Sequence, residues 1–92
     1  MDYLVYEILP GNTLGDVRDR FCDLRKAEAW CEKAIRNWSQ YGVSKEYAVY
    51  YNGVHSLKMA HYFIHSQTGS MISEHWNVDG HLSIMGASKG LI

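Results

Sequence analysis

The second half of the chain alternates between apolar and polar residues, the pattern of antiparallel strands. Residues 57–86 contain three such segments, separated by the turn sequences Ser66-Gln67-Thr68-Gly69 and Asn77-Val78-Asp79-Gly80. Each turn suits a type I turn followed by a left-handed glycine, which makes a three-residue hairpin loop. A two-residue loop at Asp79-Gly80 is the main alternative for the second turn.

The three-residue loops determine which residues face each other across the strands. The expected pairs are Trp76–Leu82, Glu74–Ile84, Ile64–Ile72, Ala60–Trp76 and His61–His75. We call these three predicted strands the meander. One of its faces is expected to belong to the core and to carry Glu74 as its only charge. Its other residues are Ala60, Tyr62, Ile64, Ile72, Trp76, Leu82 and Ile84. The two-residue loop would mix the faces, because a shift of one residue turns every side chain over.

The opposite face of the meander is polar, almost uncharged and dotted with Met and Phe residues. A face that is merely solvated usually carries Lys and Glu, so this composition predicts a surface that contacts a partner. The candidate binding residues on this face are His61, Phe63, His65, His75 and His81.

The first half of the chain predicts elements that support the meander. Residues 3–9 are rich in aromatic and β-branched types, and residues 46–52 have the same character, so both predict strands. Between them, apolar residues recur at steps of three and four from a predicted N-cap at Asp23 to a predicted stop at Gly42, which indicates an amphipathic helix whose Trp30 and Trp38 lie on the sheet. Residues 13–22 fit either a helical turn or an edge strand.

These elements predict the fold class. The order β-α-β-β-β-β indicates an α+β fold, in which one long amphipathic helix packs on one face of a four- to five-stranded, mostly antiparallel sheet. A chain of 92 residues predicts one domain, residues 1–92, with one modest core.

Composition limits the partners and the cellular location that we expect for this chain. The net charge of −1 does not favour bulk attraction to nucleic acid or to an acidic membrane. No apolar run approaches the length of a membrane-spanning helix, and the first residues do not show the basic, then apolar, pattern expected of a signal sequence. Cys22 and Cys31 have helical spacing and match neither a disulfide framework nor a zinc motif. We therefore expect a cytoplasmic protein with reduced thiols.

Catalytic motifs are missing from the sequence. It contains no phosphate-binding loop, no nucleophile elbow and no His-Glu-x-x-His. Cross-strand histidines such as His61 and His75 could ligate zinc or copper, but no carboxylate or cysteine joins them on the predicted face. We therefore expect no enzyme activity and no cofactor, and a small metal- or His-dependent enzyme is the less favoured alternative.

The strand aromatics raise a nucleic-acid alternative. Tyr47, Tyr50, Tyr51 and Phe63 could stack on the bases of a single strand. The basic residues that would follow the phosphates are sparse, since Lys58 alone lies near these rings. Direct nucleic-acid binding is left open.

A chain of 92 residues with one helix over an antiparallel sheet, no catalytic motif and an uncharged aromatic and Met-bearing face resembles small phage inhibitors. Among these it is similar to the anti-CRISPR proteins, in size and architecture over the whole chain but in no motif. The resemblance implies a phage protein that binds a CRISPR surveillance complex in the host cytoplasm and blocks target DNA. Many such inhibitors are strongly acidic and imitate DNA, and this chain is not.

A housekeeping interaction module is a different class of function that the same face would serve. In that interpretation the binding residues hold two copies of the chain together as a homodimer. Sedimentation at high concentration separates the two interpretations, because a monomer excludes the homodimer.

Overall fold

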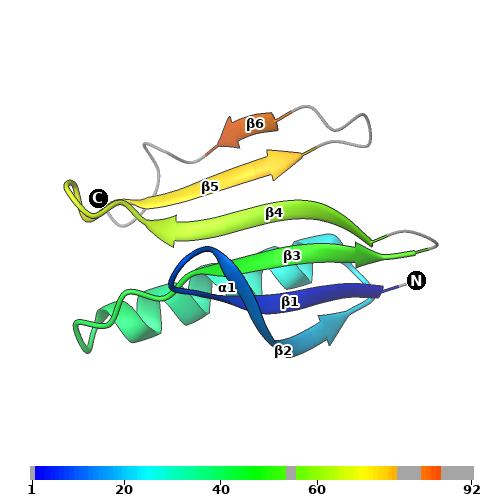
Figure 1. Cartoon of the computed structure of the whole chain (residues 1–92), viewed down its shortest axis with the longest axis horizontal. Helices are drawn as coiled ribbons and strands as arrows, with labels where there is room; N and C mark the ends of the chain where they lie inside the picture. Colours follow the sequence, from blue (N-terminus) through cyan, green and yellow to red (C-terminus); the bar gives the residue numbers. More distant parts are fainter. Residues whose placement is uncertain (1, 54–55, 77–81, 86–92) are drawn as a thin grey trace.

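The computed structural model describes residues 2–53, 56–76 and 82–85, the last without its side chains. The described elements are β1 (Asp2–Leu9), β2 (Thr13–Phe21), α1 (Leu24–Ser39), β3 (Tyr47–Asn52), β4 (Ser56–Ile64), β5 (Met71–Trp76) and β6 (Leu82–Met85). The strands form one antiparallel sheet in the order β2-β1-β3-β4-β5-β6 (Figure 1). The predicted α+β class with one helix on an antiparallel sheet is confirmed.

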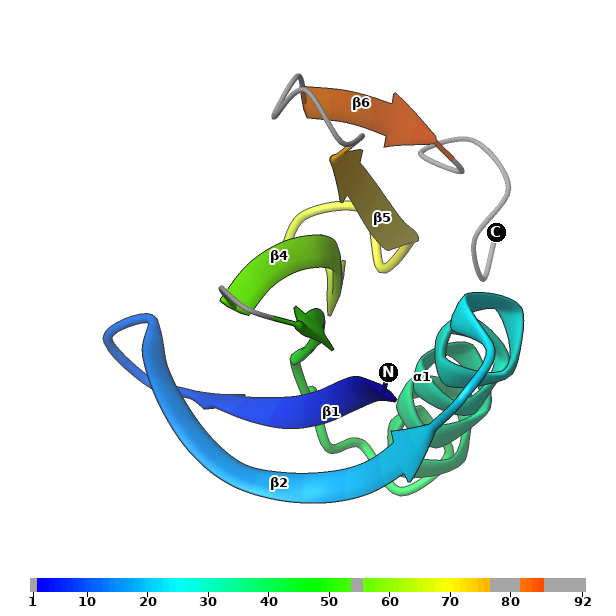
Figure 2. The ribbon, with the colours of Figure 1, turned by 90° about the vertical axis from the view of Figure 1, so that its right-hand side faces the viewer.

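Residues 13–22 fitted either a helical turn or an edge strand, and in the structure nearly all of them form the edge strand β2. β2 pairs with β1, and nearly all of its residues are exposed. Two register shifts interrupt this pairing, so β2 contains extra residues and bends strongly (Figure 2). Because β2 joins the sheet, the described sheet has six strands, more than the four or five expected.

The helix begins where its sequence predicts. The Asp23 side chain accepts a hydrogen bond from the backbone N–H of Arg25 at 2.8 Å, which satisfies one of the free N–H groups of the first turn. The helix ends at Ser39, and Gly42 follows in the left-handed region with φ +73°. Trp30 packs edge-on against the Tyr47 ring, and Trp38, which is 42% exposed, also contacts Tyr47 and carries Lys45 above its ring.

The core lies between α1 and the inner side of the curved sheet (Figure 2). The buried strand residues that form it point toward the helix. Its fully buried members are Val5, Ala27, Cys31, Ile35, Val49 and Ala60, and Tyr47, Tyr62 and Met71 are almost fully buried. This alternation leaves the next residues of β1, β3 and β4 on the other face of the sheet.

The register between β4 and β5 differs from the expectation by one residue. Ile64 pairs with Met71 and Ala60 with His75, because residues 66–69 form a four-residue loop. Backbone hydrogen bonds of 2.8 Å from His65 N to Ser70 O and from Gly69 N to His65 O close this loop. The pairs expected between β5 and β6, Trp76–Leu82 and Glu74–Ile84, are confirmed.

Candidate functional site

The sheet has a face on which no element of the described residues packs, opposite α1, and we call it the uncovered face. Near its centre, the described side chains come from four adjacent strands and from the residue that precedes β3, and the β2 residues paired with Leu4, Tyr6 and Ile8 extend the face at one edge. The central side chains are Leu4, Tyr6, Ile8, Glu46, Ala48, Tyr50, Lys58, His61, Phe63, Ile72, Glu74 and Trp76. Four of them are aromatic rings, on β1, β3, β4 and β5.

The one-residue shift in register redistributes the predicted binding residues. His61 and Phe63 lie side by side on the uncovered face, with ring centroids 5.6 Å apart. The expectation that His75 shares this face is wrong, because His61 pairs with Glu74 and His75 points toward α1. There His75 Nδ1 lies 3.0 Å from the Glu28 carboxylate, and its ring packs against Tyr62.

The two remaining predicted binding residues lie away from this centre. His65 stands at the β4–β5 turn, where its Nδ1 accepts a hydrogen bond of 3.3 Å from the backbone N–H of Gln67. His81 is outside the described residues. A role in binding for these five residues stays a prediction, although the four that the structure describes do not form one continuous patch.

The one-residue shift in the β4–β5 register also changes which side chains of β5 face the core. Ile72 and Trp76 were expected in the core, but they lie on the uncovered face, whereas Met71 and Ser73 are buried on the helix side. Glu74, the single charge expected within the core, lies on the uncovered face, beside His61. The shift therefore removes the one charge that the prediction placed in the core.

A chain of polar contacts crosses the uncovered face. Lys58 Nζ lies 2.8 Å from His61 Nδ1, and His61 Nε2 contacts the Glu46 carboxylate. The ammonium or amine of Lys58 donates, so Nδ1 of the neutral imidazole accepts and Nε2–H donates to Glu46. We call Lys58, His61 and Glu46 the relay.

A β-bulge makes the relay possible. Val49 pairs with Ala60 but Tyr50 pairs with Lys58, so Met59 is an extra residue in β4. Residues three apart in a regular strand point to opposite faces, and the bulge instead brings Lys58 and His61 to the same one. Bulges are frequent next to functional sites because they redirect a side chain in this way.

Burial shapes the electrostatics of the relay. His61 is only 7% exposed although it is polar, and its two ring nitrogens are both occupied. Burial lowers the pKa of Lys58, while the Glu74 and Glu46 carboxylates act in the opposite direction. Lys58 Nζ also lies 4.8 Å from the centre of the Trp76 ring, within the range of a cation–π contact.

Aromatic rings surround the relay. Tyr6 and Tyr50 meet edge to face with centroids 5.3 Å apart, and burial raises the pKa of the Tyr50 hydroxyl, with Tyr6 adding to the effect. Phe63 and Trp76 flank the relay on β4 and β5. Of the strand aromatics considered for base stacking, only Tyr50 and Phe63 are on this face, since Tyr47 packs under Trp30 and Tyr51 lies beside Tyr3 on the helix side.

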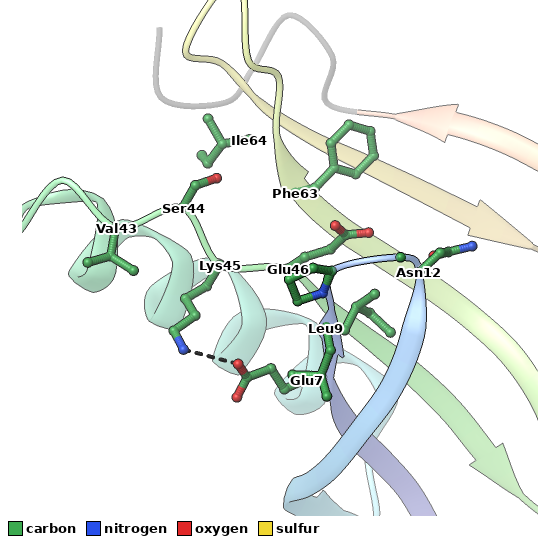
Figure 3. Close-up of a pocket in the computed structure, with 12 residues that line it drawn as sticks. Glu7, Leu9, Asn12, Val43, Ser44, Lys45, Glu46, Phe63 and Ile64 are labelled. Carbon is green, nitrogen blue, oxygen red and sulfur yellow. Dashed lines mark hydrogen bonds and ion pairs between the residues drawn. The ribbon is translucent and has the colours of Figure 1, made fainter.

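A cavity of about 670 Å³ opens at the end of the sheet next to the relay. The β1–β2 turn, the segment before β3 and the end of β4 line it (Figure 3). The Glu46 carboxylate lies on the same side of this cavity as the Phe63 ring (Figure 3). Lys45 Nζ contacts Glu7 at 3.0 Å on the other side. Glu46 therefore joins the cavity to the relay.

The arrangement can do two things chemically: offer flat rings to a partner, and move a proton along the relay between Lys58 and Glu46. Within residues 2–53 and 56–76, no group of three or more His, Cys, Asp or Glu side chains is arranged to hold a metal ion. No helix of the described residues is long and apolar enough to cross a membrane.

Sequence reasoning did not single out Glu46, Lys58, Tyr6 or Trp76 as site residues. A single Lys or Glu in a strand carries no sequence motif that marks it as functional. The bulge at Met59, which brings Lys58 and His61 to the same face, is not marked by a Gly or another turn-forming residue in the sequence. Comparison with protein families, curated proteins and solved structures finds no match for this chain. No relative therefore supplies a function that could be transferred to it.

Proposed function

We propose that this chain is a non-enzymatic, stoichiometric inhibitor that binds a partner protein through its uncovered face. The observation that supports this function is the exposure of Tyr6, Tyr50, Phe63 and Trp76, each half-buried, on one face of a single sheet. Aromatic residues are enriched at protein interfaces because they bury a large area and still offer a polar edge.

The partner that we propose is a CRISPR surveillance complex of a bacterial host. We also propose that the chain is encoded by a phage. The resemblance of the sequence to anti-CRISPR proteins supports this choice, and the net charge of −1 favours shape and apolar contacts over imitation of DNA. In this function the inhibitor acts in the host cytoplasm and obstructs the binding of target DNA.

Affinity capture tests the proposal. The tagged chain is incubated with a lysate that contains an active CRISPR system, and the retained proteins are identified by mass spectrometry. We expect a multisubunit ribonucleoprotein, and we expect Phe63→Asp to abolish its retention. Tyr41→Asp is the matched control, because Tyr41 is an aromatic residue that is 79% exposed after α1, away from the uncovered face.

Two results would reject the proposal. Retention that is equal for Phe63→Asp and the wild type would exclude the uncovered face as the interface. Recovery of the chain alone, with sedimentation as a dimer, would assign this face to self-association.

Single-stranded nucleic-acid binding is a second candidate, favoured by one specific observation. The rings of Tyr6, Tyr50, Phe63 and Trp76 follow one another across β1, β3, β4 and β5, as a stacking surface for successive bases requires. Titration of Trp fluorescence with oligothymidine tests it. Quenching that weakens with salt supports this candidate, and unchanged fluorescence excludes it.

A further inference from the structure

The relay places an amine, an imidazole and a carboxylate in series on the uncovered face. Lys58 Nζ lies 2.8 Å from His61 Nδ1, and His61 Nε2 contacts Glu46. A nucleophile within hydrogen-bond reach of a base, which a third group orients, is the arrangement that activates side chains for covalent chemistry. A partner-binding surface does not require this order of groups.

We propose that Lys58 is a reactive amine that attacks an electrophilic acyl carbon, with His61 as its base and Glu46 as the group that orients His61. This activity goes beyond the proposed binding function, because it involves only residues of this chain and a small acyl donor. Lys58 is half-buried and so remains accessible to such a donor.

The surroundings of Lys58 favour its neutral form. The charged or titratable groups that face it are Glu46 before β3, Tyr50 on β3, which pairs with Lys58 across the strands, His61 on β4 and Glu74 on β5. Burial is the largest influence and lowers the pKa of Lys58, while the two carboxylates reduce this effect. A larger fraction of Lys58 is therefore neutral near pH 7 than of a lysine in solvent.

The reaction with a thioester balances as follows. The neutral amine keeps one N–H bonded to His61 Nδ1 and attacks the acyl carbon with its lone pair. An N–C bond forms, the C–S bond breaks, and His61 accepts the amine proton while Glu46 stabilises the imidazolium. The thiolate leaves and takes up this proton, so the products are an amide on Lys58 and a free thiol.

Lys45 provides an internal control for the relay. Like Lys58, it lies over a Trp ring, Trp38, at 4.9 Å, but its Nζ forms a direct ion pair with Glu7 at 3.0 Å. The contact that distinguishes Lys58 is the imidazole of His61. Because the ion pair with Glu7 also lowers the reactivity of Lys45, the comparison excludes ring contact alone, and the loss of the difference in Glu46→Gln is what reports on the relay.

The test is site-resolved acetylation. The folded chain is incubated at neutral pH with a small acetyl thioester, S-acetyl-N-acetylcysteamine, and acetylation at each lysine is followed by peptide mass spectrometry. We expect Lys58 to react about tenfold faster than Lys45, a modest part of the ~10²–10⁴ that a positioned general base contributes. We expect Glu46→Gln to remove most of this advantage and leave the rate at Lys45 unchanged.

Two further variants complete the design. Lys58→Arg should remove the fast site without raising the rate elsewhere, and His61→Gln should slow Lys58 to the rate of Lys45. Because His61 is buried, the fold of each variant is checked by circular dichroism. Glu46→Gln carries the test if His61→Gln does not fold, since the Glu46 side chain is 38% exposed. Equal rates at Lys58 and Lys45 in the wild type, or an unchanged ratio in Glu46→Gln, would overturn the proposal.

Discussion

Cys31 is fully buried on the inner side of α1, in contact with the core under the sheet. Burial raises the pKa of its thiol, and the Glu28 and Glu32 carboxylates raise it further. Burial likewise raises the pKa of the Tyr62 hydroxyl, and Glu28 adds to the effect. Both groups therefore hold their protons more tightly in the folded chain than in the unfolded one.

This difference predicts unfolding in alkali. The unfolded thiol loses its proton near its ordinary pKa of 9.0, whereas the folded thiol keeps it. The stabilisation is complete below that pH, and above it the free energy of unfolding falls by up to about 1.4 kcal/mol per pH unit for each such group. Urea titrations from neutral pH to above the thiol pKa, with a reductant present, measure this slope.

The matched variants for this prediction are Cys31→Ala and Cys22→Ala. Removal of the buried thiol should flatten the slope just above the thiol pKa, although it also lowers stability by loss of packing. Cys22 is exposed, and its removal should leave the slope as it is. A slope that is the same in both variants would contradict the assignment of this effect to Cys31.

At the scale of the elements, the start of α1 depends on one side chain. Asp23 accepts a hydrogen bond from the first turn and also places a negative charge at the positive end of the helix. Asp23→Ala should lower the free energy of unfolding by about 1 kcal/mol. Denaturant melts measure this change.

Asp16→Ala is the control for the loss of a negative charge, because Asp16 is exposed on the edge strand β2. It should change stability by at most about 0.5 kcal/mol, as expected for exposed positions. Equal destabilisation by the two substitutions would show that the cap does not stabilise α1.

The elements also show where sequence patterns are sufficient and where they are not. The apolar stripe and Asp23 predict α1, and its buried residues Ala27, Cys31 and Ile35 follow that stripe. The β4–β5 register could not be predicted from the sequence in the same way. A loop that ends in Gly69 can contain three or four residues, and the two lengths place different side chains of β5 in the core. The choice is made by packing against α1, where His75 meets Glu28.

At the scale of the molecule, α1, β1, β3 and β4 share one core. The helix and the sheet should therefore unfold together, in one cooperative transition. A Trp38→Phe, Trp76→Phe variant leaves Trp30 as the single tryptophan, and Trp30 packs against this core. Its fluorescence and the helical circular dichroism signal should have the same urea midpoint, and separate midpoints would show that α1 melts independently.

The candidate site was less predictable than the fold, because its residues come from elements that only the fold of the whole molecule brings together. The side chains of the relay come from the residue before β3 and from both sides of a bulge in β4, and Trp76 comes from β5. Periodicity reports which face a residue occupies within a regular strand, and a bulge changes that face without a local signal. His61 and Phe63 were placed together correctly because no irregularity separates them.

The bent edge strand β2 has a consequence for the behaviour of the protein in concentrated solution. It carries Asp16, Arg18, Asp19 and Arg20 along nine residues, and two register shifts twist it. A charged, irregular edge resists the addition of a further strand, which is the first step of ribbon-like aggregation. Growth of the sheet from this edge is therefore disfavoured, so self-association in concentrated solution would have to use another surface, such as the uncovered face.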